Sequence, residues 1–406
     1  MCLFAKEVFP LQWLLTALSW ILKLLTFYTG VMGLCFLLPR KRIPQSPAGT
    51  RFAVLIPARN EQAVIGNLIA ALGNQTYPRH LYDILVIPNN CTDATEQVAR
   101  DAGAGILHCS RPVHTKGQVL QDILGQLQGQ YDAYVVFDAD NLPNPEFLAR
   151  MHDAVADGAQ VAKSRQMALN PYDSWVSGSY DLYFQSIHLM HSLGRIPFRL
   201  SAKLIGTGFM VTDRLLQTLG GWNTCTLTED IEFAAQCAQR GVQVRYVPEA
   251  INYDEEPVSF RVSMLQRRRW SAGVQQVANR YTLPLLRRRG WLCWDLAAHI
   301  NMIYVQLLAI FPAVYGLLQS SITQAAASLL ITVAGFWAGS TAMGLFLAIS
   351  ARRKLLPMLP VVLLYPLFLL SWYPLHIWGL FSKPKNWVPI PHGTTKQAAV
   401  NEKISL

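Results

Sequence analysis

Two carboxylates one residue apart, Asp138 and Asp140, stand directly after a strongly apolar stretch of the chain. Such a pair repels itself unless a positive charge lies close by. Hard divalent cations take oxygen ligands, and Mg²⁺ or Mn²⁺ commonly bridges a few carboxylates to the phosphates of a substrate. A bound cation also stabilises the charge that develops on a departing phosphate group. Because Asp-x-Asp is a common pattern, the pair predicts a metal site only if other residues agree.

A second acidic pair, Glu229 and Asp230, follows Thr228 and precedes residues 231–240, which repeat at helical spacing. One interpretation is structural: Thr228 caps a helix, and the helix dipole favours acidic residues in the first turn. The other interpretation makes Asp230 a general base that removes a proton from a hydroxyl group. The sequence around this pair leaves both interpretations open.

A third motif, residues 266–270, reads Gln-Arg-Arg-Arg-Trp. On a helix, Gln266, Arg269 and Trp270 share one face, because residues three and four positions apart are neighbours. That face offers an amide, a guanidinium group that matches phosphate oxygens with two hydrogen bonds, and an aromatic ring for stacking on a sugar. The alternative is a basic amphipathic helix that lies on a membrane surface.

Short apolar runs alternate with helical patterns between residues 44 and 256, which predicts a parallel sheet covered by helices on both faces. We expect strands at residues 52–56, 84–87 and 134–137, and helices at residues 63–72, 94–102 and from about 145. Ligands of such sheets bind beyond the carboxyl ends of the strands. Polar loops follow the three strands at that edge, at residues 57–61, 88–93 and 138–141.

An apolar run occupies residues 8–38, and Lys23 is its only charged residue. The run exceeds the roughly 7–15 residues of a signal-peptide core, and no Ala-x-Ala pattern follows it, so we expect a membrane anchor. A lysine at the centre of a bilayer costs about 2.5–3.5 kcal/mol. We therefore expect one long helix with Lys23 turned toward the other helices rather than toward lipid.

Three more apolar runs, at about residues 293–318, 325–350 and 355–381, reach the roughly 20 residues that a membrane-spanning helix needs. The last run contains four prolines, and we expect it to be kinked or re-entrant. With alternating crossings, the basic clusters at residues 40–42, 287–289 and 352–354 fall on one side, which the positive-inside bias makes cytoplasmic. We expect an integral protein of the plasma membrane with its catalytic domain in the cytosol.

The expected organisation has five parts. They are an anchor at residues 1–43, a cytosolic domain at 44–256, a basic segment at 257–290, three membrane segments at 291–382 and a tail at 383–406. Only 15% of the residues are charged, against about a quarter in a typical soluble protein. This deficit lies at the two ends of the chain, where the membrane segments are expected.

The formal net charge is +10, and residues 257–290 contain eight arginines and no acidic residue. Nucleic-acid binding is one interpretation of a basic cluster. Because this cluster directly precedes an apolar run, we favour an interfacial segment beside anionic lipid headgroups and expect no nucleic-acid partner. On this segment we expect Arg269 and Trp270 to face the functional site and residues 287–289 to face lipid.

The seven cysteines form no Cys-x-x-Cys pair and are odd in number. Neither a disulfide framework nor a zinc site is expected from this pattern. Such usage fits a reducing cytosolic compartment for the central domain.

These motifs and loops occur in an order and at spacings that resemble the family 2 glycosyltransferases, over about residues 51–270. More narrowly, they look like the membrane-integrated branch that contains the cellulose, hyaluronan, chitin oligosaccharide and poly-N-acetylglucosamine synthases. The resemblance implies an α/β catalytic domain of the Rossmann-like GT-A type with flanking transmembrane helices. It also implies a Mg²⁺ or Mn²⁺ cofactor and a nucleotide-sugar donor, with uridine as the expected base.

The resemblance further implies how the donor would be held. Pro57 and Glu61 would line the nucleoside pocket, and Asp93 would contact the nucleotide. Lys116 would lie near the diphosphate. The family often has an acidic residue where this chain has Asn89, whose amide can hydrogen-bond a base edge but carries no charge.

The remaining motif residues would carry the metal, the chemistry and the acceptor. By the same resemblance, Asp138 and Asp140 would hold the metal, and Asp230 would be the base. Arg269 would close over the diphosphate. The residues expected beside the acceptor or product are Gly206, Thr207, Gly208, Glu229, Gln266 and Trp270.

The expected reaction is an inverting transfer, in which the deprotonated acceptor hydroxyl attacks the sugar opposite the nucleotide and an α-linked donor gives a β-linked product. The expected acceptor is a growing glycan, extended processively from a donor of the UDP-glucose or UDP-N-acetylglucosamine type. Four spans make a small bundle for a glycan channel, so a membrane lipid is the alternative acceptor. A non-catalytic sugar-binding membrane protein is a third possibility, disfavoured because Asp138, Asp140 and Asp230 are all present.

Overall fold

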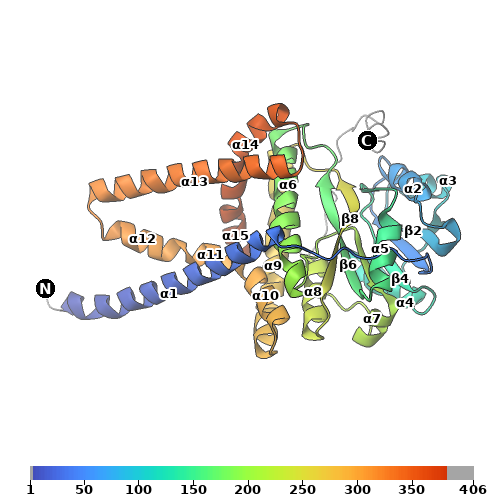
Figure 1. Ribbon diagram of the computed structural model, residues 1–406, viewed down its shortest axis with the longest axis horizontal. Helices are drawn as coiled ribbons and strands as arrows, with labels where there is room; N and C mark the ends of the chain where they lie inside the picture. Colours follow the sequence, from blue (N-terminus) through green and yellow to red (C-terminus); the bar gives the residue numbers. More distant parts are fainter. Residues whose placement is uncertain (1–2, 382–406) are drawn as a thin grey trace.

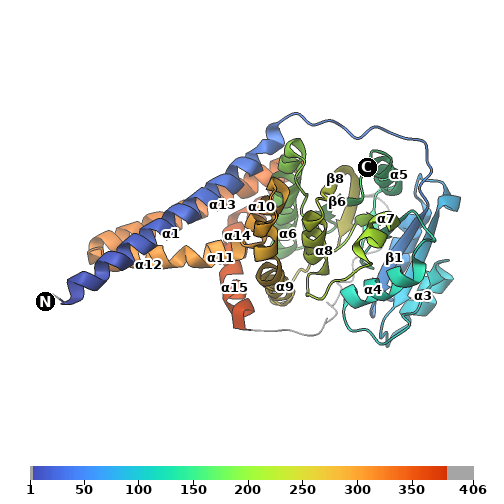
Figure 2. The same cartoon turned by 90° about the horizontal axis from the view of Figure 1, so that it is seen from below.

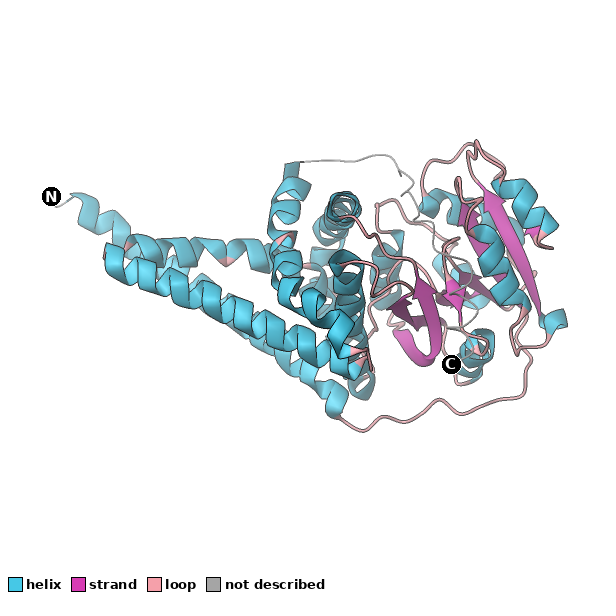
Figure 3. Cartoon of the chain, turned by 90° about the horizontal axis from the view of Figure 1, so that it is seen from above, coloured by secondary structure: helices cyan, strands magenta, loops and turns pink. Residues whose placement is uncertain are grey.

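The computed structural model describes residues 3–381 of the chain. Figure 1 shows two parts, an α/β domain built around a central sheet and a group of long helices that extends away from it. The view in Figure 3 shows the strands gathered within the α/β domain, with helices on both sides of them.

Eight strands form one sheet in the order β3-β2-β1-β4-β7-β6-β8-β5. They are β1 (Phe52–Ala58), β2 (Tyr82–Pro88), β3 (Gly105–Ile106), β4 (Ala133–Val136), β5 (Leu142–Pro143), β6 (Val161–Ala168), β7 (Phe209–Thr212) and β8 (Val244–Asp254). Strands β1, β2 and β4 run parallel, as expected. Strand β7 is antiparallel to both β4 and β6, and β5 is antiparallel to β8. The expected parallel arrangement therefore holds for the three predicted strands, whereas the complete sheet is mixed.

The path of the chain explains the reversed strand. Strands β6 and β4 run in one direction, and β7 between them runs in the other, so residues 169–208 begin and end at the same edge of the sheet. This edge is the one where β1, β2 and β4 end. A segment that stays at one edge needs no crossover back across the sheet. The reversal therefore places residues 206–208 beside the loops that follow β1 and β4.

Both faces of the sheet are covered, and β1 is buried along its whole length. Ala53 and Leu55 belong to the core on one face, together with Leu120 of α4 (Lys116–Leu127). Val54 belongs to the core on the other face, together with Leu68 of α2 (Ile65–Gly73). Successive side chains of a strand point to opposite faces, so a strand covered on both faces becomes a continuous apolar run.

The helices of the domain agree with the expected ones to within a few residues where the sequence indicated them. They are α2 (Ile65–Gly73), α3 (Thr95–Asp101), α4 (Lys116–Leu127), α5 (Phe147–Ala156), α6 (Trp175–Ser186), α7 (Asp213–Leu219), α8 (Glu229–Gln239) and α9 (Phe260–Arg287), with short 3₁₀ turns η1 (Cys35–Leu37) and η2 (Arg79–Leu81). Helix α6 continues into a π-helical segment, η3 (Ile187–Ser192), and then into a 3₁₀ segment, η4 (Leu193–Phe198). Such π-helical segments often occur at functional sites.

The long helices correspond to the four apolar runs. They are α1 (Leu3–Leu34), α10 (Trp291–Ile300), α11 (Met302–Leu308), α12 (Ile310–Leu318), α13 (Ile322–Ser350), α14 (Leu355–Leu370) and α15 (Trp372–Phe381). Within residues 3–381, three stretches could cross a membrane by length and composition: Leu11–Leu37, Ile322–Ser350 and Leu355–Phe381. The pair Trp291–Ile300 and Met302–Leu318, bent by 50°, would make a fourth.

The last apolar stretch is arranged differently from the others. In Figures 1 and 2, α1, α12 and α13 extend away from the α/β domain, whereas α14 and α15 run across their direction beside it. Helix α14 packs on α6, and α15 packs on α9. The helix is interrupted only at Ser371, between α14 and α15, and residues Leu355–Phe381 together make one candidate span, so the expected kink stays a prediction. Although long enough to span a membrane, this stretch covers the domain.

The first apolar run is one continuous helix, as expected, but Lys23 does not face the other helices. Its side chain is exposed, and its ammonium group lies 5.1 Å from the centre of the Trp20 ring. The expectation of an inward-facing lysine is therefore wrong. The aromatic ring partly compensates the charge through a cation–π contact within the same helix.

The basic cluster between α13 and α14 is tied to the domain. Arg353 forms two hydrogen bonds with the carboxylate of Asp181 on α6, at 2.8 and 2.6 Å. Arg352 and Lys354 remain exposed on either side of it. One arginine of the cluster therefore anchors the α13–α14 turn to the sheet domain, and the two flanking cations stay on the surface.

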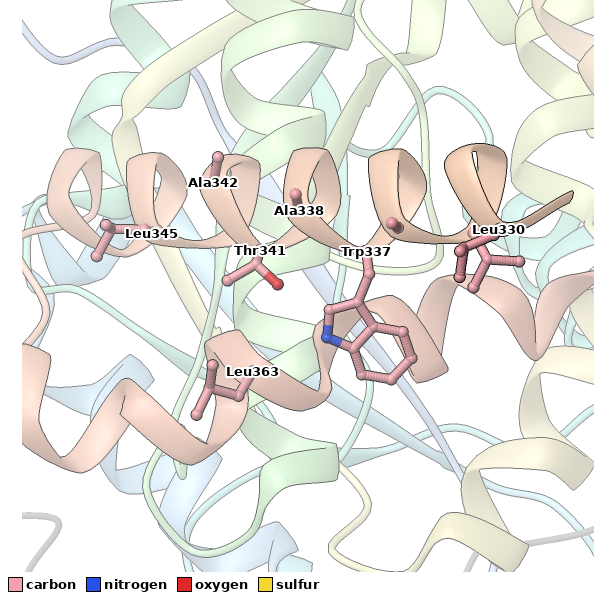
Figure 4. A pocket seen from close by; sticks show the side chains of 9 residues that line it. Leu330, Trp337, Ala338, Thr341, Ala342, Leu345 and Leu363 are labelled. Atoms are coloured by element: carbon pink, nitrogen blue, oxygen red, sulfur yellow. The ribbon is translucent and has the colours of Figure 1, made fainter. Parts of the chain in front are cut away.

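A separate, open apolar groove of about 670 Å³ runs along α13, with Leu363 of α14 at its edge. Figure 4 shows Trp337 and Thr341 of α13 on the side that faces Leu363 of α14. Thr341 carries the only polar side-chain oxygen among the residues that line it. Such a lining offers no acid, base or cation for chemistry, so the functional site must lie elsewhere.

Candidate active site

One continuous cavity joins the edge of the sheet to the long helices. Its volume is about 710 Å³, within the roughly 300–1,000 Å³ that small-molecule sites occupy. The loops after β1 and β4 and the first turns of α4 and α8 line one end. Residues of α1, α10, α11 and α15 line the other end. The cavity therefore has a polar end at the sheet and a second end among the apolar helices.

Asp138 and Asp140 lie at the polar end, in the loop that follows β4. The Asp138 side chain is 41% exposed, and its backbone N–H donates to the Thr207 hydroxyl at 2.9 Å. Lys116 Nζ lies 2.5 Å from Asp138 Oδ1 and 2.7 Å from the Gly206 carbonyl oxygen. A single ammonium group thus connects the start of α4, the acidic pair and the segment before β7.

The acidic pair fits a metal ion that arrives with a phosphate ligand. Across residues 3–381, no three His, Cys, Asp or Glu side chains converge as a metal site would require. Mg²⁺ is usually bound through one or two carboxylates together with substrate phosphates and water rather than by a cage of protein ligands. Asp138 and Asp140 supply the carboxylates, and the remaining ligands would come from the bound substrate.

Lys116 is a permanent cation at this end. Burial alone would lower the pKa of its ammonium group, but the carboxylates of Asp138, Glu229 and Asp230 outweigh burial, and the pKa is raised. Gly117 lets this lysine approach, because a Cβ there would lie 3.2 Å from the Cβ of Glu229. A side chain at this position would push the start of α4 away from α8.

Asp230 is held by two backbone groups in the first turn of α8. Its Oδ1 accepts from the N–H of Ile231 at 2.7 Å, and its Oδ2 accepts from the N–H of Gly206. Thr228 precedes the helix, but its hydroxyl makes no capping bond and is buried without a partner among the described residues. The simple capping interpretation of Thr228 therefore does not hold, and Asp230 instead connects α8 to residue 206.

Burial makes both acids of this turn weaker than usual. Burial, reinforced by the adjacent carboxylate of Asp230, raises the pKa of Glu229 to about 7. Burial also raises the pKa of Asp230, although the N–H groups of Gly206 and Ile231 and the charge of Lys116 oppose the rise. Carboxylates with raised pKa values in a cavity are typical of groups that accept a proton during a reaction.

A second row of polar side chains stands behind the acidic pair, and the sequence did not indicate it. The Asn141 side chain is fully buried and donates to Asp254 Oδ1 at 2.9 Å. Gln166 donates to the other carboxylate oxygen at 2.6 Å. Burial raises the pKa of Asp254, which also lines the cavity, to about 7. Asp254 ends β8, which only the assembled sheet identifies as a neighbour of the site.

The face of α9 expected at the site does line the cavity, with Gln266, Arg269 and Trp270. The Tyr180 hydroxyl donates to Gln266 Oε1 at 2.7 Å. The Tyr180 ring also meets the Trp270 ring edge-on, with 5.9 Å between the ring centres. Tyr180 thus orients two of the three motif side chains from the neighbouring helix α6.

Arg267 and Arg268, which lie between Gln266 and Arg269 in the motif, do not line the cavity. The buried Arg267 guanidinium donates to the Phe368 carbonyl oxygen at 3.1 Å and to the Ser371 hydroxyl at 2.8 Å. It also lies 4.1 Å from the centre of the Phe368 ring. Arg268 lies 3.7 Å from the centre of the Trp378 ring. These two arginines attach α9 to α14 and α15, a role that helical spacing alone does not reveal.

Helices α8 and α9 approach closely at Gly273. A Cβ at Gly273 would lie 2.6 Å from the Thr228 methyl carbon and 2.9 Å from the Thr228 backbone nitrogen. The contact involves backbone, which cannot move aside as a flexible side chain can. The absence of a side chain at residue 273 therefore allows the α9 face to close on the turn that carries Asp230.

Most of the site residues predicted from the sequence line this one cavity. They are Pro57, Glu61, Lys116, Asp138, Asp140, Gly206, Thr207, Glu229, Asp230, Gln266, Arg269 and Trp270. The structure therefore brings together residues that lie up to 213 positions apart in the chain. Their individual roles stay predictions.

Three predicted residues do not line the cavity. Asn89 is buried beside it, and its carbonyl oxygen accepts from Arg59 at 3.1 Å. Asp93 accepts from the backbone N–H of Thr95 at 3.1 Å. Gly208 donates to the Val136 carbonyl oxygen at 2.8 Å and so continues the sheet. All three take part in hydrogen bonds with backbone or side-chain groups outside the cavity lining.

Known proteins resemble this chain over the same region. The probable glycosyltransferase YdaM of Bacillus subtilis is 28% identical over 257 residues, which is 61% of this chain and 60% of that protein. The β-monoglucosyldiacylglycerol synthase of Nostoc sp. is 26% identical over 353 residues, which is 81% of this chain and 72% of that protein. The chain thus spans somewhat under two thirds of the first relative's length and somewhat over two thirds of the second's.

A solved structure shares the fold. It is the mannosyltransferase PcManGT from Pyrobaculum calidifontis in complex with GDP-Man and Mn²⁺, with a TM-score of 0.61 and 16% identity, covering 90% of this chain and 99% of that chain. The sheet and its helices are accordingly of the GT-A type, as expected. Residues 47–273 match the family described as glycosyltransferase like family 2. Because this match covers more than half of the chain and contains the acidic pair, Lys116 and the α8 and α9 motifs, the chain belongs to that family.

Proposed function

We propose that the chain is an inverting glycosyltransferase that transfers a sugar from a nucleotide-sugar donor to a membrane lipid. The observation that carries this proposal is the continuous cavity, which extends from Asp138 and Asp230 to side chains of α1, α11 and α15. A lipid held among these helices would present its polar end to the acidic residues. A soluble acceptor would have no use for the end of the cavity that lies among apolar helices.

The donor would bind at the sheet end. Asp138 and Asp140 would hold a Mg²⁺ or Mn²⁺ ion together with the diphosphate, and this ion would stabilise the charge of the leaving group. Lys116 and Arg269 add positive charge for the same phosphates. The presence of GDP-Man and Mn²⁺ in the mannosyltransferase of the same fold supports a nucleotide sugar and a metal. We propose a donor of the UDP-glucose or UDP-N-acetylglucosamine type.

The nucleoside would lie against the loops after β1 and β2. Pro57 and Glu61 line the cavity there, and Asn89 and Asp93 shape the loop beside them. The two loops are joined directly, because Asn60 Oδ1 accepts from the backbone N–H of Thr92 at 2.8 Å. A rigid pair of loops at the carboxyl edge of the sheet is suited to holding a base and ribose.

Asp230 would act as the base. It would take the proton of the acceptor hydroxyl, whose oxygen would then attack C1 of the sugar from the face opposite the diphosphate. The N–H groups of Gly206 and Ile231 hold the carboxylate in place. Its raised pKa makes it a stronger base than an exposed aspartate. Gln266 and Trp270 would position the acceptor on the other side.

The membrane arrangement follows from the same helices. We propose that α1, the bent α10–α12 segment and α13 lie in a membrane, with the α/β domain on the cytosolic side. The basic clusters at residues 40–42, 287–289 and 352–354 stand at the ends of these segments, and residues 287–289 are exposed. With alternating crossings these clusters would fall on one side, which would agree with the positive-inside bias. A location in the plasma membrane is part of this proposal.

The second candidate acceptor is a growing β-linked glycan. The observation that favours it is the Trp270 ring in the cavity wall, since an aromatic ring there can stack on a sugar already attached. The relative that aligns over 81% of this chain is named for a diacylglycerol product, and it supports the lipid instead. We therefore rank the lipid first.

The test uses the full chain, purified into lipid vesicles and supplied with labelled nucleotide sugars. We expect release of the nucleotide and a labelled product that extracts into organic solvent as a single species. A ladder of water-soluble products on a gel would establish the glycan acceptor in place of the lipid. If no nucleotide sugar is consumed with any lipid, the non-catalytic alternative stands and the proposed activity is wrong.

A further inference from the structure

Two histidine side chains and one lysine side chain lie at the end of the cavity that is formed by the long helices. His191 on η3, Lys203 before β7 and His299 on α10 all line it. The two imidazole rings meet edge to face, with 4.5 Å between their centres. None of these three residues belongs to the family motifs described above, and the proposed chemistry does not use them.

Behind the group, a buried ion pair fixes its position. Arg195 and Asp295 are both buried, and Arg195 Nε lies 3.0 Å from Asp295 Oδ2. Tyr28 of α1 donates to Asp295 Oδ1 at 2.9 Å. Arg195 also donates to the Met190 carbonyl oxygen at 2.7 Å, a group of the π-helical segment. Segments from three distant parts of the chain therefore hold these side chains rigidly.

This pairing determines which nitrogen of His299 carries a proton. Arg195 Nη2 lies 3.0 Å from His299 Nδ1. A guanidinium group can only donate, so Nδ1 must accept, and a neutral imidazole then carries its proton on Nε2. Within residues 3–381, His299 Nε2 is buried and has no hydrogen-bond partner. A buried N–H without an acceptor is unfavourable, so the site calls for an oxygen atom supplied by a ligand.

Lys203 and His191 add a positive potential. Lys203 forms no hydrogen bond or ion pair with any described residue, and its ammonium group lies 5.8 Å from the centre of the Tyr183 ring. Burial, helped by the charges of Lys203 and Arg195, lowers the pKa of His191 well below its ordinary value. His191 Nδ1 is also buried without a partner within the described part of the chain. The oxygen that this group needs is therefore best supplied by an anion.

We propose that His299, Lys203 and His191 form a subsite that binds the phosphate group of an anionic acceptor lipid. This inference rests on the proposed function and narrows its acceptor to a lipid whose headgroup contains a phosphate. Thr29 of α1 and Met302 and Ile303 of α11 line the cavity around the group, so apolar chains can continue between the helices. The remainder of the headgroup would extend along the cavity toward Asp230.

The subsite differs from the place proposed for the donor diphosphate. The charges acting on His191 are those of Lys203 and Arg195. The charges acting on Lys116 are those of Asp138, Glu229 and Asp230. Each end of the cavity thus has its own lysine, and only the sheet end has the acidic pair for a metal. A nucleotide sugar is expected to bind at one end and a lipid phosphate at the other.

The experiment measures lipid binding without a donor. The purified full chain in detergent is titrated with phosphatidic acid and with diacylglycerol of the same acyl chains, which differ only in the phosphate. Lys203→Met and His299→Phe are compared with Lys354→Met, a control at an exposed lysine. Thermal melting of each variant reports its folding. Inorganic phosphate serves as a competitor.

We expect wild type and Lys354→Met to bind phosphatidic acid at least about tenfold more tightly than diacylglycerol, since a charged hydrogen bond contributes that much or more. Each subsite variant should lose roughly tenfold in affinity for phosphatidic acid while melting as wild type does. Lys203 has no hydrogen bond or ion pair to lose among residues 3–381, so its variant keeps the test decisive if His299→Phe fails to fold.

The inference is overturned if the two lipids bind equally, or if Lys203→Met keeps the preference for phosphate. It is also overturned if inorganic phosphate displaces phosphatidic acid at equal concentration, because the site would then recognise phosphate without a lipid. A protein that consumes nucleotide sugar but binds both lipids equally keeps its proposed function and loses this subsite. A protein that prefers phosphatidic acid but never consumes a nucleotide sugar keeps the subsite and loses the function.

Discussion

The replacement of Asp230 by asparagine tests the proposed base most directly. The carboxylate accepts one backbone N–H at each oxygen, from Ile231 and from Gly206. An asparagine offers one oxygen and one NH₂ group, so one of these N–H groups would face another donor. A hydrogen bond to a charged group contributes about 1.5–3 kcal/mol. Removal of a buried charge offsets part of this loss, and we expect a destabilisation of about 1–2 kcal/mol.

The expected effect on turnover is larger. A general base contributes about 10²–10⁴ in rate, which corresponds to roughly 2.7–5.4 kcal/mol in the activation barrier. Asp230→Asn should therefore lower kcat by at least about a hundredfold. The affinity for the nucleotide should change by less than about threefold, because the base acts on the acceptor.

Glu232 provides a matched control in the same turn of α8. It is completely buried, and its Oε2 accepts from the backbone N–H groups of Cys225 and Thr226 at 2.8 and 2.7 Å. It does not line the cavity. Glu232→Gln can keep both backbone bonds on its remaining oxygen but loses the bond that the Tyr281 hydroxyl donates to Oε1 at 3.0 Å. It should therefore destabilise the protein by about 1 kcal/mol and leave kcat within a few-fold of wild type.

The assay combines nucleotide release at saturating donor, equilibrium binding of the nucleotide and thermal melting for each variant. The reasoning is refuted if Asp230→Asn keeps a tenth or more of the wild-type kcat. It is equally refuted if Glu232→Gln loses as much activity as Asp230→Asn, because the effect would then follow from loss of a buried acid in α8 and not from loss of a base.

Three further predictions concern the metal, the pH dependence and the basic segment. Excess EDTA should abolish nucleotide release and Mn²⁺ or Mg²⁺ should restore it, whereas full activity in EDTA would exclude a metal at the acidic pair. Because burial raises the pKa of Asp230, activity should be lost as the pH falls through a value above that of an ordinary aspartate, and a kcat profile flat down to about pH 4 would contradict this. Arg269→Ala should be inactive in anionic and in neutral vesicles. The triple Arg287/Arg288/Arg289→Ala variant should keep activity but lose its preference for anionic lipid. Each arginine should contribute about 1 kcal/mol to binding of anionic lipid. If the triple variant is as inactive as Arg269→Ala in every lipid, residues 287–289 do not have a role separate from that of Arg269.

Local patterns predicted much of the catalytic domain. The buried strands β1 and β4 appear as continuous apolar runs because side chains on both of their faces are covered. Helical spacing placed Gln266, Arg269 and Trp270 on one face, and that face does line the cavity. The polar loops after these strands meet at one edge because parallel strands end there.

Other features depended on contacts that no local pattern encodes. The reversal of β7 follows from the return of residues 169–208 to the same edge of the sheet. Asp254 joins the site through the pairing of β8 with β6, 88 residues away from its hydrogen-bond partner Gln166. Lys23 stays exposed because the neighbours of α1 pack on its other side.

The sequence by itself determined three motifs and their order along the chain: the acidic pair, the α8 turn and the α9 face. It also determined where the apolar runs lie. These features can be predicted because each depends on residues within about one helical turn or one strand. The tertiary structure alone decided that one cavity joins those residues to α1, α11 and α15, and that Arg195 sets the proton of His299 from 104 residues away. The tertiary structure also decided that α14 and α15 pack against the domain, where Arg267 donates a hydrogen bond to α14. The physical reason is that apolar length indicates how far a helix can reach, whereas its direction depends on the side chains it meets when the chain folds.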